Sequence, residues 1–144
     1  MHKWLMTLIL IPLLSGRPQK IDWQQLRDVT FTDRYSREIN AYYYFPRFGE
    51  SVRQLEGKTI EISGFMLPID PEEDFYVLSE NPFSSCFFCG SGGPESIIEL
   101  EWGEKGHGRF KNDEYVKVRG VLRLNQNDIY RCSYILENAE QIME

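Results

Sequence analysis

Residue types that bind metals or carry catalysis are scarce in this chain of 144 residues. It contains three cysteines and two histidines, so a four-ligand zinc site would use most of them. The 16 basic residues are outnumbered by 22 acidic ones, and the formal net charge is −6. Because phosphate binding normally needs a basic face, this balance argues against a nucleic-acid partner. No internal repeat or low-complexity tract divides the chain, and its length suits one domain.

Catalytic motifs are also missing. The sequence has no G-x-S-x-G turn and no H-E-x-x-H motif. His2 belongs to the N-terminal apolar segment, which leaves His107 alone and unable to complete a convincing Ser-His-Asp or Cys-His set. Three neighbouring acids, Glu72, Glu73 and Asp74, lie in a polar turn, where solvated charge is the ordinary account. We therefore expect a binding protein and not an enzyme.

One long apolar run occurs, at the N-terminus. A short basic start is followed by apolar residues from Trp4 to Leu14 and then by small residues at 15 and 16. This layout is typical of a secretory signal peptide, and the run is shorter than the ~20 residues of a bilayer-spanning helix. We predict a signal peptide over residues 1–16 and one secreted or periplasmic domain over residues 17–144, with membrane contact only through this segment before cleavage. A buried N-terminal helix or a membrane anchor is the alternative.

The region after residue 52 alternates apolar and polar residues in five short runs separated by turn residues, which is typical of β-strands. We predict an all-β domain, a small five-stranded barrel of the OB type, with an Ig-like β-sandwich as the alternative. Gly64 and Gly120 lie inside the first and fourth runs, where we expect barrel strands to bend. Cys132 lies in the fifth run, just after the turn at residues 126–128.

An aromatic run, INAYYYFPRF, precedes the barrel strands at residues 39–48. We predict a strand that Pro46 ends, because proline cannot donate to a ladder. A stacking platform for a ligand is the alternative. Further upstream, Trp23 and Leu26 are expected to contact the core.

The segment SSCFFCGSGGPES, residues 84–96, is the most distinctive in the chain. The CxxC spacing of Cys86 and Cys89 suits one zinc or copper(I) ion. We predict metal binding there, zinc before copper, with the remaining ligands taken from Cys132, His107 and Glu95. The residues predicted to shape the loop, the glycines by adopting positive φ, are Gly90, Gly92, Gly93 and Pro94.

Other interpretations of the same residues stay open. Cys132 is expected chiefly as a buried core thiol, because alternating strands would place it at the opposite end of the barrel from the CxxC. His107, between glycines, is expected in a solvated loop, and Glu95 at the surface. In an oxidising compartment the CxxC is alternatively a disulfide staple, in a structural domain or in one that binds an extracytoplasmic protein partner. A slow thiol-redox protein is the third alternative. The apolar pair at residues 87–88, without a nearby Lys or Arg, disfavours a reactive thiolate.

The chain resembles a group of small secreted bacterial proteins of uncharacterised function over roughly residues 23 to 138. The shared core is L-x-GK-x-(V/I)-x-I-x-G-(F/Y)-x-x-P, matched here by Leu55, Gly57, Lys58, Ile60, Ile62, Gly64, Phe65 and Pro68. In the larger family a single cysteine and a proline-rich stretch follow, which Cys86 and Pro94 match. Cys89 departs from that pattern and is similar to a subgroup with the form SCFFCG-x-x-GPE. The resemblance implies the barrel fold, the extracytoplasmic compartment and a link to metal handling, and it supplies no reaction.

Overall fold

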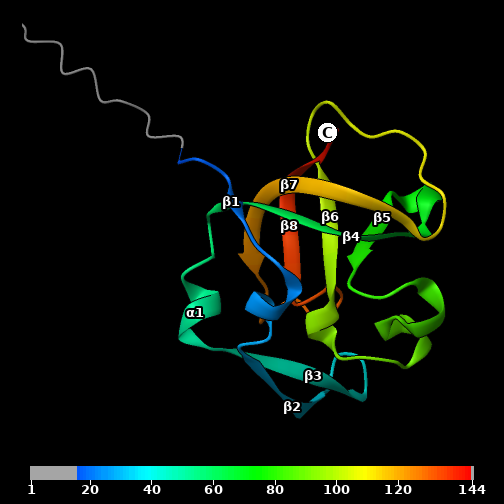
Figure 1. The fold of residues 1–144 in the computed structure, drawn as a ribbon. Coiled ribbons are helices and arrows are strands. Elements are labelled where there is room, and N and C mark those ends of the chain that lie inside the picture. Colours follow the sequence, from blue (N-terminus) through cyan, green and yellow to red (C-terminus); the bar gives the residue numbers. More distant parts are fainter. Residues whose placement is uncertain (1–15, 144) are drawn as a thin grey trace, which may run out of the picture.

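Five strands curl into a closed barrel in the computed structural model, which describes residues 16–143 without the side chain of Cys89 (Figure 1). The predicted signal peptide therefore lies outside the described residues, apart from Gly16. The barrel strands are β4 (Thr59–Asp70), β5 (Phe75–Ser79), β6 (Ile97–Trp102), β7 (Glu114–Leu124) and β8 (Tyr134–Ile142).

The strand order of the barrel is β4-β5-β6-β8-β7, and pairing between β4 and β7 closes it. β6 and β8 run parallel, whereas the other neighbours among these five strands are antiparallel. This order, with parallel third and fifth strands, is that of an OB-like barrel, and the predicted all-β fold is confirmed. The Ig-like alternative fails because the strands form one closed sheet and not two facing sheets.

Strand direction decides which loops meet. β5 and β7 are both antiparallel to β4, so both run the same way along the barrel. The loops that follow them, residues 80–96 (the cysteine loop) and residues 125–133 (the pocket loop), therefore leave the barrel at the same end, and both lie near the hairpin described below (Figure 1). The expectation that these loops lie at opposite ends is wrong: strands two apart in an alternating series end on the same side.

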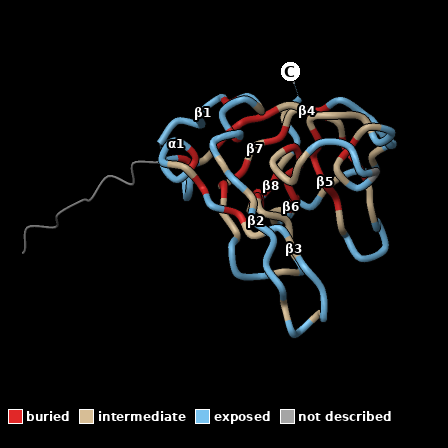
Figure 2. The backbone as a smooth tube through the Cα atoms, turned by 90° about the horizontal axis from the view of Figure 1, so that it is seen from below, coloured by how far each residue is buried: buried red, intermediate tan, exposed pale blue. Residues whose placement is uncertain are grey.

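Apolar residues that alternate along the strands fill the barrel, as Figure 2 shows by the buried segments at its centre. Gly64 and Gly120 are needed because neighbouring strands come close there. A Cβ on Gly64 would lie 2.6 Å from the carbonyl oxygen of Ser79, and one on Gly120 would lie 2.7 Å from that of Glu137. The β7–β8 register also shifts beside Gly120, which fits the predicted bend.

An N-terminal layer packs on the barrel. It comprises β1 (Gln19–Lys20), the 3-10 helix η1 (Trp23–Leu26), β2 (Val29–Ser36), β3 (Ala41–Phe48) and α1 (Glu50–Arg53). Leu26 is fully buried and Trp23 packs on the core, as predicted. The Trp23 indole donates to the carbonyl oxygen of Ser63 at 2.8 Å.

β2 and β3 form an antiparallel two-stranded sheet, the hairpin, which projects from the barrel (Figure 2). β2 was not predicted from the sequence. The prediction that Pro46 ends the strand is also wrong, because Pro46 lies within β3, paired with Phe31. In the two-stranded hairpin β3 pairs with β2 along one edge, and its other edge has no partner strand within residues 16–143. β3 is therefore an edge strand, and edge strands tolerate proline.

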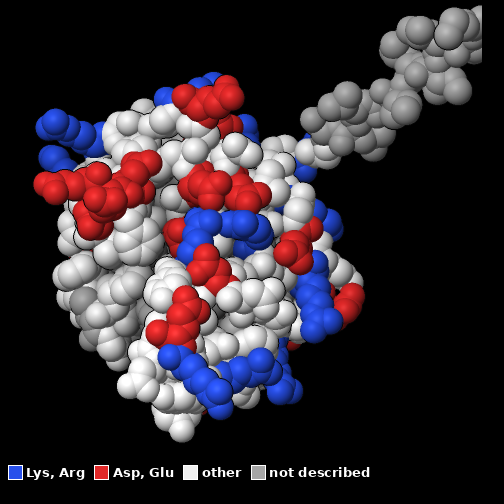
Figure 3. Space-filling view, turned by 180° about the vertical axis from the view of Figure 1, so that it is seen from behind, with Lys and Arg blue, Asp and Glu red and all other residues white. Residues whose placement is uncertain are grey.

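Short 3-10 helices fill two connections: η2 (Pro71–Glu73) between β4 and β5, and η3 (Phe83–Ser85), η4 (Phe87–Cys89) and η5 (Pro94–Ser96) in the cysteine loop. Residues 71–74 are exposed, as predicted for the acidic turn. Over residues 16–143, no helix has the length and apolar character needed to cross a membrane. On the face seen in Figure 3, acidic and basic side chains lie next to one another over most of the surface, and a row of Lys and Arg side chains follows its lower edge.

Candidate binding pocket

A pocket of about 310 Å³ lies where the hairpin, the cysteine loop and the pocket loop meet. Its lining comes from segments that are far apart in the sequence. The aromatic and apolar lining residues are Tyr43, Tyr44, Pro46, Phe75, Phe87, Phe88, Pro94, Ile97, Ile129 and Tyr130. The volume is at the lower end for small-molecule sites, which favours a small ligand or a single side chain of a larger one.

Four aromatic rings follow one another along this pocket. The ring of Tyr44 contacts Phe87 at a centroid distance of 6.4 Å, and Phe87 contacts Phe88 at 5.7 Å. Phe88 in turn contacts Phe75 at 6.4 Å. All three contacts are edge-to-face, so successive rings stand steeply to one another and form walls instead of a flat stack.

Two hydrogen bonds join the hairpin to the pocket loop. The side-chain amide of Gln126 donates to the carbonyl oxygen of Pro46 at 2.9 Å. The phenol of Tyr130 donates to the carboxylate of Glu38, in the hairpin turn, at 3.1 Å, and this bond raises the pKa of Tyr130. These contacts position the aromatic face of the hairpin over the pocket.

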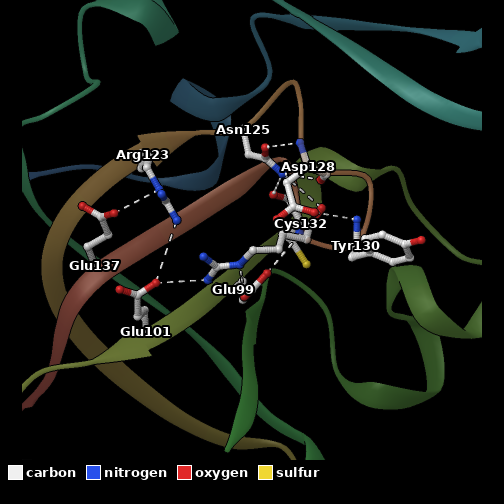
Figure 4. Close-up of polar contacts among 9 residues, drawn as sticks. Glu99, Glu101, Arg123, Asn125, Asp128, Tyr130, Cys132 and Glu137 are labelled. Carbon is white, nitrogen blue, oxygen red and sulfur yellow. Dashed lines mark hydrogen bonds and ion pairs between the residues drawn. The ribbon is translucent and has the colours of Figure 1, made fainter. Parts of the chain in front are cut away.

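Asn125 and Asp128 organise the pocket loop (Figure 4). The amide nitrogen of the Asn125 side chain donates to the carbonyl oxygens of Asp128, Arg131 and Cys132, and its oxygen accepts from two backbone N–H groups. One carboxylate oxygen of Asp128 accepts the Tyr130 backbone N–H at 3.0 Å. Asp128 has no ion-pair partner within residues 16–143, and it is one of two charged residues in the lining.

The other charged residue of the lining, Arg131, is held by acids. Its Nε donates to Glu99 at 2.8 Å and its Nη2 to Glu101 at 3.1 Å. Burial opposes the charge of Arg131, but the hydrogen bonds and the attraction of these carboxylates outweigh it and raise its pKa. Nearby, Arg123 lies between Glu101 and Glu137 and continues the network along the sheet (Figure 4).

Cys132 and Cys86 belong to one apolar cluster on the outer face of β5. Cys86 is fully buried there, with Leu67, Val77 and Ile97, and Cys132 and Phe87 pack against the same group. Burial, and then the negative charge of Glu99, raises the pKa of the Cys132 thiol to about 12. The Cys132 thiol packs against this cluster but is half-buried, not enclosed as the predicted core thiol, and it lies near the CxxC loop instead of at the opposite end of the barrel. The two cysteines are not joined by a disulfide.

His107 is not the solvated loop residue that was predicted. Its ring packs against Tyr76, Trp102 and Phe110, and its Nε2 lies 2.6 Å from an Asp74 carboxylate oxygen. Tyr76 belongs to the barrel core, whereas the next residue along β5 faces the cluster of Cys86. Because successive strand residues face opposite ways, His107 and Cys86 lie on opposite faces of the sheet.

The remaining predicted site residues shape or flank the cysteine loop. Gly90 and Gly92 adopt positive φ, as predicted, but Gly93 does not: it caps η5 with φ near −101°. Pro94 begins η5 and also lines the pocket. Glu95 follows it and is half-buried, not exposed at the surface as predicted. Burial, and then the negative charge of Glu95, raises the pKa of Tyr134. Among the side chains described, which exclude that of Cys89, no group of three or more His, Cys, Asp or Glu is arranged to hold a metal ion.

Comparisons with known proteins give no match to a family model, a curated protein or a solved structure. The resemblance to small secreted bacterial proteins therefore stays a prediction. Of the lining residues, the aromatic run of the hairpin, the Phe87–Phe88 pair, Pro94 and Cys132 were noted from the sequence. The other lining residues of the pocket loop were not predicted as part of a site, and their sequence signal was the turn-forming run NQND at residues 125–128.

Proposed function

We propose that this protein is a secreted or periplasmic binding module that holds a small organic group in the pocket beneath the hairpin. The observation that carries this proposal is the pocket itself, walled by aromatic rings from the hairpin and the cysteine loop. Concave, mostly apolar sites with a few polar groups are the usual form of a ligand site. Several rings remain open to solvent: Tyr44 is 56% exposed, Phe88 43% and Tyr130 71%.

A titration with benzylamine, benzyl alcohol and benzoate, followed by amide chemical shifts of the labelled protein, tests the pocket without presuming the charge of the ligand. At least one probe should shift amides in residues 43–46, 87–88 and 125–133 together, because these segments line one cavity. Phe88→Ala should weaken that binding by removing a wall. Phe83→Ala is the matched control, since Phe83 is 44% exposed in the same loop but does not line the pocket. Scattered or absent shifts with all three probes contradict the proposal.

Soft-metal binding through the cysteines is a second candidate function, and one observation favours it. Cys132 packs in the same cluster as Cys86, so the fold brings a third cysteine to the CxxC loop. Zinc or copper(I) would bind the thiolates of Cys86, Cys89 and Cys132, with His107 on the far face of the sheet and outside the set. Metal binding would have to overcome the raised pKa of Cys132, because the metal takes the thiolate.

The metal content and the thiol count of protein purified without chelator test this candidate. Stoichiometric zinc or copper that is lost in both Cys86→Ser and Cys132→Ser supports it. If the metal is lost in Cys86→Ser but kept in Cys132→Ser, Cys132 is a core thiol and not a ligand. Absence of metal, with Cys86 and Cys89 in a disulfide, favours instead the stapled binding domain.

A further inference from the structure

We propose that the pocket selects a small organic cation, an alkylammonium group held between aromatic walls beside Asp128. This inference rests on the proposed function and adds the chemical class of the ligand. It is carried by charge complementarity around the pocket and by the arrangement of its rings.

The charges nearest the pocket leave an acid unbalanced. Arg131 is the basic residue in the lining, and the carboxylates of Glu99 and Glu101 hold its guanidinium. Asp128, the acidic residue in the lining, has a hydrogen bond to one oxygen only, from the backbone N–H of Tyr130. The cysteine loop, residues 80–96, contributes no Lys or Arg. A cation would therefore meet an unpaired carboxylate, whereas an anion would meet a neutralised arginine.

The register of the hairpin places acidic and basic side chains on different faces of its two strands. Tyr44, which lines the pocket, pairs directly with Asp33, so both side chains lie on one face of the hairpin. Arg34 and Arg47 alternate with these positions and lie on the opposite face, together with Tyr43, which also lines the pocket and pairs directly with Arg34. On that face Arg34 stacks 3.4 Å from the centre of the Phe45 ring. Arg37 lies in the turn beyond the strands, next to Glu38. The face that carries Tyr44 and Pro46, two of the three hairpin residues in the lining, thus holds an acid and aromatic rings.

The rings suit a compact cation better than a flat aromatic ligand. Tyr44, Phe87 and Phe88 meet edge-to-face, at interplanar angles of 63° and 67°. Walls at steep angles surround a tetrahedral group, whereas a flat ligand stacks best on parallel faces. The electron-rich face of an aromatic ring attracts alkylammonium groups, and this attraction grows when water is excluded.

Choline and its carbon isostere, 3,3-dimethylbutan-1-ol, have nearly the same shape and differ in charge, so the pair isolates the charge contribution. We expect choline to shift the amides of residues 43–46, 87–88 and 125–133, with a Kd about tenfold lower than that of the alcohol. Asp128→Asn should raise the Kd of choline by about threefold or more and leave the Kd of the alcohol unchanged. The substitution removes the negative charge but keeps a side-chain oxygen that can accept the backbone N–H of Tyr130. Glu72→Gln, in the exposed acidic turn outside the pocket lining, is the matched control and should change neither Kd.

Peptides that carry trimethyllysine or norleucine at one position identify the source of the cation. Tighter binding of the trimethyllysine peptide than of choline identifies the ligand as a side chain of another protein. Tighter binding of choline identifies it as a small free cation. Both results support the inference. If the alcohol binds as tightly as choline, the pocket is selective for shape alone, and the cation inference is overturned while the proposed function stands. If neither choline nor 3,3-dimethylbutan-1-ol binds but benzyl alcohol or benzoate does, the cation inference is again overturned while the proposed function stands. If no probe of either series binds, both proposals fail.

Discussion

Arg131 donates from Nε to Glu99 at 2.8 Å, and the same carboxylate accepts the backbone N–H of Cys132 at 3.0 Å. Glu99 thus joins β6 to the pocket loop and neutralises the base that lines the pocket. Its side chain is 12% exposed and that of Arg131 is 27% exposed, so the pair is partly shielded from water. This one carboxylate therefore contributes both to the order of the pocket loop and to the charge balance of the pocket.

Glu99→Gln should therefore lower the free energy of unfolding by about 1–3 kcal/mol, because a charged hydrogen bond is lost while the arginine stays partly buried. Urea denaturation measures the change. Glu101→Gln is the control: Glu101 is 50% exposed, and its loss should cost less than about 1 kcal/mol. Equal losses of unfolding free energy in the two variants would show that Glu99 does not stabilise the protein more than the exposed Glu101 does.

The thiol of Cys132 should resist alkylation in the folded protein. Its pKa of about 12, against an ordinary value of 9.0, leaves little thiolate at neutral pH, and its partial burial slows access. Mass spectrometry after iodoacetamide treatment should find Cys132 unmodified near pH 8 in the folded chain and modified in guanidinium chloride. Rapid modification of the folded protein would contradict the half-buried, protonated thiol.

The same thiol should make stability fall at alkaline pH. Above about pH 9 the unfolded chain loses the thiol proton while the folded chain keeps it, so the unfolded state gains stability until the pH passes the folded pKa of about 12. This contribution is complete below about pH 9, and its loss amounts to at most about 1.4 kcal/mol per pH unit. Cys132→Ala removes the contribution, so its stability should decline less steeply than that of the wild type between about pH 9 and pH 11. Parallel declines would show that the thiol is not responsible.

Gly64→Ala should destabilise the barrel by about 1–3 kcal/mol, since the new methyl group would overlap a backbone carbonyl of β5 that cannot move independently. Thermal or urea unfolding measures the loss. Gly108→Ala is the control, because a Cβ there would meet nothing within 4 Å. A neutral Gly64→Ala would mean that β4 and β5 separate more easily than their pairing suggests.

Tyr134→Phe should cost about 1–2 kcal/mol, because the buried phenol donates to the carbonyl oxygen of Leu26 at 2.6 Å and ties the N-terminal layer to β8. The variant should also increase hydrogen exchange in η1. Tyr115→Phe, at a residue that is 65% exposed, serves as the control and should be near neutral. If exchange in η1 does not change, the phenol is not what holds that layer.

The barrel was predictable because its signals are local. Alternation along the strands marks which residues face the core, and glycines at 64 and 120 mark positions where strands approach closely. β2 was missed because VTFTDRYS is polar at most positions and is a strand only through its pairing with the aromatic run of β3. Pro46 was misjudged because a prohibition that holds inside a sheet does not hold on an edge.

The candidate site depended on contacts between segments distant in the sequence. The sequence by itself determined the alternation, the turns and the aromatic and cysteine content, because each depends on neighbouring residues. Only the tertiary structure decided that the cysteine loop and the pocket loop leave the barrel at the same end, which brings Cys132 to the cluster of Cys86. It also decided that His107 lies on the opposite face of β5, and that Tyr44 and Pro46 of the hairpin line the pocket from the face that carries Asp33. The physical reason is that strand direction and pairing register follow from how the whole sheet closes, and no local stretch of sequence contains that information.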